Sequence, residues 1–151
     1  MIFNTTTVLN LMADIIETAV NAGTFNTLVE AIKATDLVDI LKSPGPYTVF
    51  APTDEAFNKL PEGVTLDALL QDNHKLKRIL TYHVAFGDVR AEDLMQIEEA
   101  ETVEGSVVAV ESASGSIKVN NANILQSDIL TDNGVIHVID AVLIPGLVAA
   151  E

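Results

Sequence analysis

Apolar residues recur every three or four positions through much of the first half of the chain, which is the spacing of an amphipathic helix. The pattern predicts helices over residues 13–20, 25–32, 37–41, 66–70 and 75–81. Gly23 is suited to end the first helix, and Asp36 and Thr65 are suited to cap the third and fourth. The apolar positions expected to face the core are Ile15, Ile16, Ala19, Val20, Phe25, Leu28, Val29, Ile32, Leu37, Val38, Ile40, Leu41, Leu76, Ile79 and Leu80.

A short apolar strand over residues 47–51 interrupts the helical half. Pro52 ends it, and Thr53 is a favourable N-cap for a following helix. Asp54 and Glu55 then fall in the first helical turn, where the helix dipole favours negative charge. Pro61 and Gly63 are expected to close that helix.

The second half of the chain changes to strand spacing. Strands are predicted over residues 103–111, 116–120, 124–130 and 135–144, with a turn at residues 114–115. The four residues 131–134, Thr-Asp-Asn-Gly, are a hairpin signal between the last two strands. Helices early and antiparallel strands late predict an α+β fold with helices on one face or end of a sheet. We expect one domain over residues 1–151, with residues 1–10 as a loose N-terminal segment.

Composition narrows the chemistry. With no tryptophan, two tyrosines and five phenylalanines among 151 residues, the core must be mainly aliphatic. The absence of cysteine excludes disulfides, thiolate metal sites and cysteine nucleophiles.

The formal charge of −14 makes nucleic-acid binding improbable, because such a surface repels phosphate backbones. It also predicts a monomer or weak oligomer. The basic stretch at His74, Lys75, Lys77 and Arg78 is interpreted as a solvated helix face.

No apolar run has the length of a membrane span. The N-terminus lacks the features of a signal peptide, so either the protein is cytoplasmic or a signal was removed.

Two segments are the most specific in the sequence. Residues 48–57 read Thr-Val-Phe-Ala-Pro-Thr-Asp-Glu-Ala-Phe, and residues 133–140 read Asn-Gly-Val-Ile-His-Val-Ile-Asp. A Tyr82-His83 pair lies between them. In this order and spacing they resemble the motifs of the fasciclin-like (fasciclin I) domain family over nearly the whole chain, and the early helices resemble bacterial secreted members. The residues that match the two motifs as scaffold are Thr48, Phe50, Pro52, Thr53, Asp54, Phe57, Asn133, Gly134, His137 and Asp140.

The resemblance implies an antiparallel β-wedge or sandwich of about seven strands with a layer of helices. It also implies a secreted, periplasmic or cell-surface module that mediates adhesion or matrix attachment through protein–protein contacts, without catalysis. The expected partner is a cell-surface or matrix protein, integrin-like or polysaccharide-associated. An alternative from the same family is binding of a small hydrophobic ligand such as a carotenoid, held between helices and sheet.

Two residue pairs are candidates for contact with a partner. Tyr82 and His83 match a family segment linked to integrin contact, and the sequence around them looks strand-like; the alternative is a buried imidazole that hydrogen-bonds neighbouring backbone. Asp128 and Ile129 occupy the position of an integrin-recognition Asp-Ile in vertebrate members, where a carboxylate suits coordination of a metal ion held by the partner. Gln126 and Ser127 replace the Glu and Pro of that context. The alternative is that Asp128 closes a turn while Ile129 joins the core.

The remaining polar candidates are expected to be structural. His137 lies in a run of apolar residues, and Asp140 would pair with a backbone amide or with a base such as Arg78. Asp54 is expected to support the N-terminus of its own helix. The three histidines lie far apart without acidic partners at ligand spacing, which disfavours a metal site. No motif supplies a nucleophile with a base or binds a cofactor, so no enzymatic activity or cofactor is expected.

Overall fold

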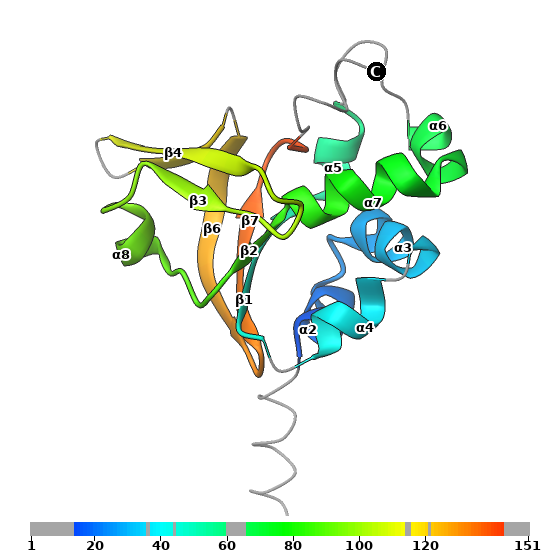
Figure 1. The fold of residues 1–151 in the computed structure, drawn as a ribbon, viewed down its shortest axis with the longest axis horizontal. Coiled ribbons are helices and arrows are strands. Elements are labelled where there is room, and N and C mark those ends of the chain that lie inside the picture. Colours follow the sequence, from blue (N-terminus) through cyan, green and yellow to red (C-terminus); the bar gives the residue numbers. More distant parts are fainter. Residues whose placement is uncertain are drawn as a thin grey trace, which may run out of the picture.

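The computed structural model describes residues 14–35, 37–43, 45–59, 66–113, 116–120 and 122–143. Helices α2, α3, α4 and α7 lie on one side of strands β1 and β7, while α8, β3 and β4 lie on the other (Figure 1). The predicted α+β class and seven strands are confirmed. The helices are α2 (Ile15–Ala22), α3 (Asn26–Ala34), α4 (Leu37–Lys42), α5 (Asp54–Phe57), α6 (Leu66–Gln71), α7 (Asn73–Tyr82) and α8 (Ala91–Leu94). The strands are β1 (Tyr47–Pro52), β2 (Val84–Phe86), β3 (Glu99–Glu101), β4 (Val107–Ala113), β5 (Ser116–Val119), β6 (Ala122–Thr131) and β7 (Gly134–Ile139).

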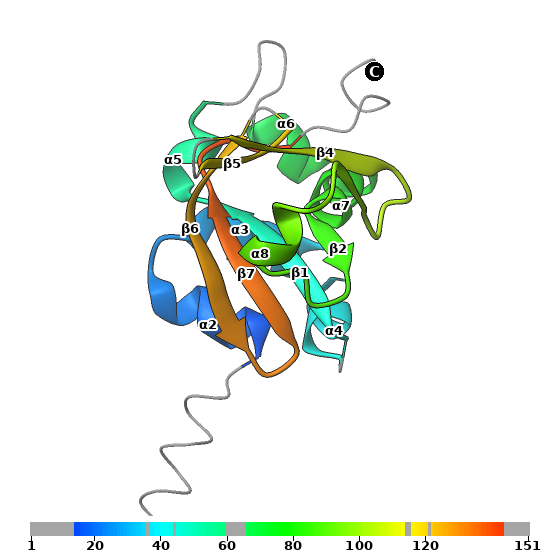
Figure 2. The same cartoon turned by 90° about the vertical axis from the view of Figure 1, so that its left-hand side faces the viewer.

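The sheet follows the strand order β2-β1-β7-β6-β5-β4-β3 and bends so that its two ends approach each other (Figure 2). An isolated bridge joins Ala85 of the end strand β2 to Thr102, the residue that follows the other end strand, β3. Five of the six strand pairs are antiparallel, but β1 and β7 run parallel, with Tyr47 opposite Gly134. The sheet is therefore mixed, which departs from the purely antiparallel arrangement expected from the sequence.

Strand β7 is buried on both faces and separates two cores. Ile136 and Val138 belong to the core that is packed under the helices. Ile139 belongs to the core inside the bent sheet, together with Phe50 and Tyr82. An apolar run buried on both faces is the sequence signature of a central strand, so β7 is the axis around which the fold is built.

Local signals set several helix ends as predicted. Gly23 ends α2 in a left-handed conformation with φ of 76°. Thr53 caps α5, because its hydroxyl oxygen accepts a hydrogen bond from the Ala56 amide at 3.2 Å. Asp14, which was not predicted as a cap, caps α2 in the same way through the Glu17 amide at 2.8 Å. Each cap satisfies an amide that a helix leaves unpaired in its first turn.

Asp54 departs from its predicted role. It lies in the first turn of α5, but its carboxylate binds the N-terminus of α3 instead: Oδ1 accepts from the Thr27 amide at 2.7 Å and Oδ2 from Asn26 Nδ2 at 3.3 Å. Desolvation acts to raise the pKa of Asp54, but these bonds outweigh it and hold the pKa below its usual value. Asp54 thus joins two helices that are separated along the chain.

Other predictions about element boundaries need correction or lie outside the description. The strand predicted from residue 103 begins at Val107, and the strand predicted to reach residue 144 ends at Ile139. The short elements β2, α8 and β3 were not predicted. The caps at Asp36 and Thr65, the stops at Pro61 and Gly63, the turn at residues 114–115 and the segment 1–10 lie outside the described residues.

The hairpin predicted at residues 131–134 is confirmed, since Thr131 and Gly134 pair across the β6–β7 turn. Gly134 also faces β1 at close range: a Cβ atom there would lie 1.9 Å from the Tyr47 carbonyl oxygen. A glycine is therefore required for β1 and β7 to approach each other.

Gly134→Ala should lower the free energy of unfolding by about 3 kcal/mol or more, because the added methyl overlaps backbone rather than a movable side chain. Urea denaturation at neutral pH measures the loss. Gly87→Ala is the matched control: its φ of 90° also disfavours alanine, but no heavy atom lies within 4 Å of the added methyl. A smaller loss, about 1–2 kcal/mol, is expected there. Equal losses would contradict the role given to the contact with Tyr47.

Candidate binding surface

The Asp128–Ile129 pair lies in a β-bulge of strand β6. The pairing of β6 with β7 shifts register between Gln126 and Ile129, and Asp128 adopts a left-handed backbone with φ of 58°. A bulge of this kind bends a strand and re-aims its side chains. Asp128 is exposed, whereas Ile129 is half-buried and packs against the core under the helices.

Asp128 is fixed by hydrogen bonds from two other elements. Its carboxylate Oδ1 accepts from the Ala91 amide at 2.9 Å, at the N-terminus of α8. Its own amide donates to Nδ1 of His137 at 3.2 Å. Asp128 therefore stabilises the bulge and the N-terminus of α8, which agrees with the structural alternative stated for it above. Its side chain nevertheless stays at the surface.

His137 is fully buried on β7 and connects the bulge to the segment before α8. Its Nε2 bonds the Val89 carbonyl oxygen at 2.7 Å, and its ring stacks on Phe50 with centroids 5.8 Å apart. Burial lowers the pKa of His137, while the bond to Val89 and the carboxylates of Asp128 and Asp88 act to raise it. The predicted structural role of His137 agrees with this placement.

Tyr82 and His83 lie at a helix end rather than in a strand. Tyr82 is the last residue of α7 and His83 is its C-cap, so the strand-like interpretation of this segment was wrong and β2 begins at Val84. The Tyr82 hydroxyl donates to the Val107 carbonyl at 3.0 Å and accepts from Asn120 Nδ2 at 3.1 Å. Both side chains are buried. A partner could reach them only if the surrounding packing opened.

The imidazole of His83 connects the end of α7 with the segment after β7. Nδ1 bonds the Ile79 carbonyl oxygen at 2.7 Å, and Nε2 accepts from the Leu143 amide at 2.8 Å. Both bonds require a neutral ring with its proton on Nδ1. Burial lowers the pKa of His83 to about 4, despite the opposing effect of the bond to Ile79.

Two further motif residues tie strands and loops together. Thr48 on β1 donates through its hydroxyl to the Gly87 carbonyl at 2.7 Å and accepts from the Val89 amide at 2.8 Å. Asp140 accepts from the amide and the side chain of Asn123, at 2.8 and 3.0 Å, which realises the backbone partner predicted for it. These contacts hold the loop before α8 and the start of β6 in place.

Exposed apolar residues flank the bulge on the same strand. Leu125 is 60% exposed and Leu130 is 53% exposed, although β7, the strand paired with β6, is buried along its whole length. We define Leu125, Asp128, Ile129 and Leu130 as the β6 surface. The sequence identified its central pair but not its two leucines, because an apolar residue within an apolar strand gives no sign that it faces solvent.

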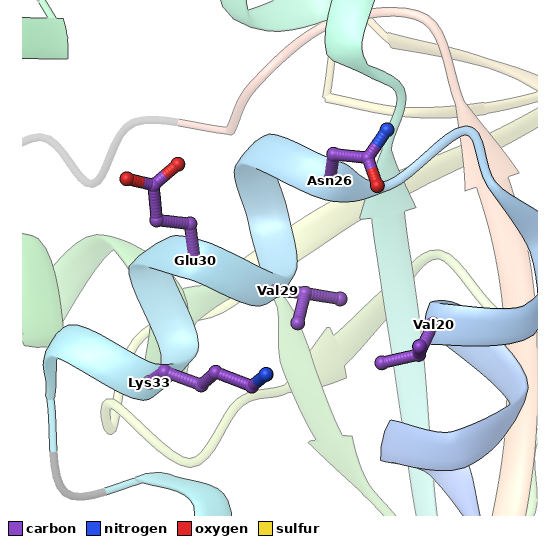
Figure 3. Close-up of a pocket in the computed structure, with 5 residues that line it drawn as sticks. All are labelled: Val20, Asn26, Val29, Glu30 and Lys33. Atoms are coloured by element: carbon purple, nitrogen blue, oxygen red, sulfur yellow. The ribbon is translucent and has the colours of Figure 1, made fainter.

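An open hollow of about 330 Å³ lies on the outside of the helical layer, between α2 and α3 (Figure 3). Val20, Val29 and Lys33 point toward it, and Val20 is 48% exposed. The space between the helices and the sheet, where the alternative hypothesis would hold a hydrophobic ligand, is packed with side chains such as Leu28, Val49 and Ile136. The hollow is open to solvent, so it does not enclose a ligand.

Among the described residues, histidines and acids form no group of three or more arranged to hold a metal ion. Over the same part of the chain, no helix combines the length and apolar character needed to cross a membrane.

Comparisons with known proteins agree with the fold. The fasciclin domain model matches residues 23–145. An uncharacterized protein of Synechocystis is 50% identical over 135 residues, which cover 89% of this chain and 100% of that protein. The transforming growth factor-beta-induced protein ig-h3 of Sus scrofa is 37% identical over 92% of this chain and 20% of its own length.

A solved structure, the FAS1 domain pair from the insect cell adhesion molecule fasciclin I, superposes with a TM-score of 0.75. The match covers 90% of this chain and 52% of that chain at 20% sequence identity, so it supports the fold alone. The family model and the Synechocystis relative carry the assignment further: the chain belongs to the fasciclin domain family.

Proposed function

We propose that this chain is a secreted, periplasmic or cell-surface adhesion module that binds a surface or matrix protein through the β6 surface and performs no reaction. The observation that carries the proposal is the exposed Asp128 carboxylate, held in a fixed bulge between two exposed leucines. Membership of the fasciclin family supports it, as does the occurrence of the same fold in an insect cell adhesion molecule.

The geometry of Asp128 leaves part of its carboxylate for a partner. Oδ1 is bonded to Ala91, whereas Oδ2 makes no hydrogen bond within the described part of the chain. A carboxylate oxygen of this kind can complete the coordination of a divalent cation held by a partner, or accept a hydrogen bond from it. The exposed leucines on the same strand add apolar contact area, which is the usual composition at the centre of an interface.

The bulge gives this contact a defined shape before binding. Asp128 is held from α8 through Ala91 and from β7 through His137, so little ordering remains when a partner arrives. Preorganisation of this kind raises affinity because it reduces the entropy lost on association. Tyr82 and His83, being buried, support the scaffold in this proposal and do not contact the partner.

Asp128→Asn should reduce attachment by about fivefold or more, because it removes the charge but keeps an oxygen that can accept from Ala91. The assay coats a surface with the purified protein. It measures adhesion of integrin-bearing cells in the presence of Mn²⁺ and, separately, retention on an insoluble extracellular polysaccharide matrix. Asp132→Asn is the matched control, since Asp132 is also exposed and lies in the β6–β7 turn.

Attachment by the wild-type protein no stronger than that of an unrelated acidic protein, in both arms of the assay, would overturn the proposed function. Equal attachment by Asp128→Asn and wild type would instead remove Asp128 from the contact. A Leu130→Ser variant tests the apolar part of the β6 surface in the same assay, with a loss of similar size expected.

A further inference from the structure

The Asp128 bulge depends on one protonation state of His137. The ring accepts from the Asp128 amide through Nδ1, at 3.2 Å, so Nδ1 carries no proton. The proton of the neutral ring is therefore on Nε2, which donates to the Val89 carbonyl at 2.7 Å. This neutral form satisfies both neighbours, one on β6 and one in the segment that leads into α8.

A second proton on the ring removes one of these bonds. A protonated imidazole carries hydrogens on both nitrogens, so Nδ1–H would face the Asp128 N–H and two donors would oppose each other. The bond to Val89 persists, because Nε2 remains a donor. The strain therefore falls on the β6 side of the ring, at the bulge, rather than on the segment before α8.

Burial lowers the pKa of His137, and two carboxylates near the ring oppose this effect in part. Within the described ranges, Asp128 on β6 and Asp88 in the segment before α8 are the charged groups that act on His137, and both favour a positive ring. Arg90 offsets part of this effect, since its guanidinium binds Asp88 at 3.1 Å. The third neighbour, Phe50 on β1, presents its ring face and carries no charge. His83 is as deeply buried, but the only favourable contact that offsets its burial is its bond to Ile79.

We infer that His137 is a pH-dependent latch for the β6 surface: the neutral ring fixes the Asp128–Ile129 bulge against α8, and protonation of the ring releases it. This inference concerns regulation of the surface in the proposed function and rests on that function for its biological meaning. With the latch open, the Asp128 carboxylate turns toward the charged imidazole and leaves the Ala91 amide. The β6 surface then loses the shape that the bulge gave it, and attachment weakens in acid.

The test is a titration of the isotope-labelled full chain by NMR from pH 7.5 to 4.5, in the absence of any partner. The amides of Asp128 and Ala91 report on the latch, the Leu143 amide reports on His83, and the ring signals of His137 report its own protonation. We expect the Asp128 and Ala91 amides to change with the same midpoint as the His137 ring. Their hydrogen-exchange protection factors should fall by about five- to tenfold, the loss expected for one hydrogen bond.

The outcomes separate a latch from a structural histidine. Changes at Asp128 that follow the His137 ring while Leu143 stays unchanged support the inference. Simultaneous changes at Asp128 and Leu143 mean general acid unfolding and overturn it. An Asp128 amide that ignores protonation of the His137 ring also overturns it.

Two variants sharpen the result. Asp88→Asn removes an exposed carboxylate that favours the charged ring, so the Asp128 midpoint should move to lower pH; a midpoint that stays in place contradicts the latch. His74→Gln alters an exposed histidine and should leave the Asp128 titration unchanged. These readouts need no partner. The latch can therefore be absent although the protein attaches at neutral pH, or present although it does not attach, so the two proposals are tested independently.

Discussion

Replacing Asn133 with alanine should lower the free energy of unfolding by about 3–5 kcal/mol, although the residue lies in a tight turn. Its side chain is only 5% exposed and makes three hydrogen bonds to distant backbone. Oδ1 accepts from the Ile15 amide at 3.0 Å, and Nδ2 donates to the carbonyls of Leu41 and Ser43 at 2.6 and 2.8 Å.

The expected loss of stability is large because the substitution leaves buried backbone groups without a hydrogen-bond partner. The Ile15 amide begins α2, and the Leu41 carbonyl belongs to the last turn of α4. Both are groups that helix ends leave without an internal partner. Alanine would strand them without replacement, so α2 and α4 would lose their attachment to the β6–β7 turn at the same time.

Chemical denaturation of the wild type and Asn133→Ala at pH 7 measures the effect. Asn26→Ala is the control, because the two bonds of that asparagine are exposed and a loss of no more than about 1 kcal/mol is expected. Similar losses for the two variants would contradict the account.

A second substitution tests the donor role of Asn133 alone. Asn133→Asp keeps the size of the side chain but places a carboxylate against the Leu41 and Ser43 carbonyls. Burial raises the pKa of such a carboxyl above its value in the unfolded chain, so its protonation favours the folded state. The stability deficit of this variant relative to wild type should therefore narrow between pH 7 and pH 5.

Elements fixed by nearby residues could be predicted from the sequence. The cap at Thr53, the left-handed stop at Gly23 and the hairpin at residues 131–134 each depend on contacts within a few positions. The helix over residues 75–81 was also predicted, because its inward apolar face gives a clear period. In these places the local preference and the final fold agree.

Elements that are held by residues far away in the sequence could not be predicted from the sequence. Helix α8 has only four residues, and its first amide is satisfied by Asp128, 37 positions away. Strand β2 has three residues and is held by β1 and by one bridge to Thr102. The parallel pairing of β1 with β7 joins Tyr47 to Gly134 across most of the domain. No local pattern encodes such pairings.

The candidate site shows the same division. Asp128 stood out because Asp128 and Ile129 occupy the position of an integrin-recognition Asp-Ile in the family that the sequence resembles, whereas the bulge at this position was not predicted. Its dependence on His137 was invisible, since both residues lie in continuous strand patterns and only the register shift brings the amide of one to the ring of the other. Tyr82 and His83 were misread as strand because they directly precede the apolar residues of strand β2, which begins only at Val84.

Lowering the pH from 7.5 to 5 should reduce the stability of the wild type by about 2 kcal/mol through His83 alone, and further through His137. His83 has a pKa of about 4 in the folded state, against 6.5 for an unperturbed histidine. The unfolded chain therefore binds a proton below about pH 6.5, while the folded chain resists protonation until about pH 4. Stability is retained above pH 6.5 and is lost progressively below it.

Asp14 and Asp54 contribute to the pH dependence of stability below this range. The pKa values of Asp14 and Asp54 are lowered: desolvation raises both, but hydrogen bonds outweigh it, together with the charge of Lys42 at Asp14. Their contribution to stability is present above the ordinary carboxyl pKa and is lost only as the pH falls below it. Urea denaturation at pH 7.5, 6.5, 5.5 and 5.0 measures the loss expected from the two buried histidines.

His83→Gln should flatten this dependence while costing about 1–3 kcal/mol at pH 7.5, because the amide oxygen can accept from Leu143 but the donor to Ile79 is lost. Below pH 6.5 the gap between variant and wild type should then close, since the variant no longer resists protonation at this position. His74→Gln, at an exposed histidine, should reproduce the full wild-type slope. If His83→Gln were as steep as wild type, the burial of a neutral imidazole at the junction of α7 with Leu143 would not be what makes the fold acid-sensitive, and His137 would have to carry the entire effect.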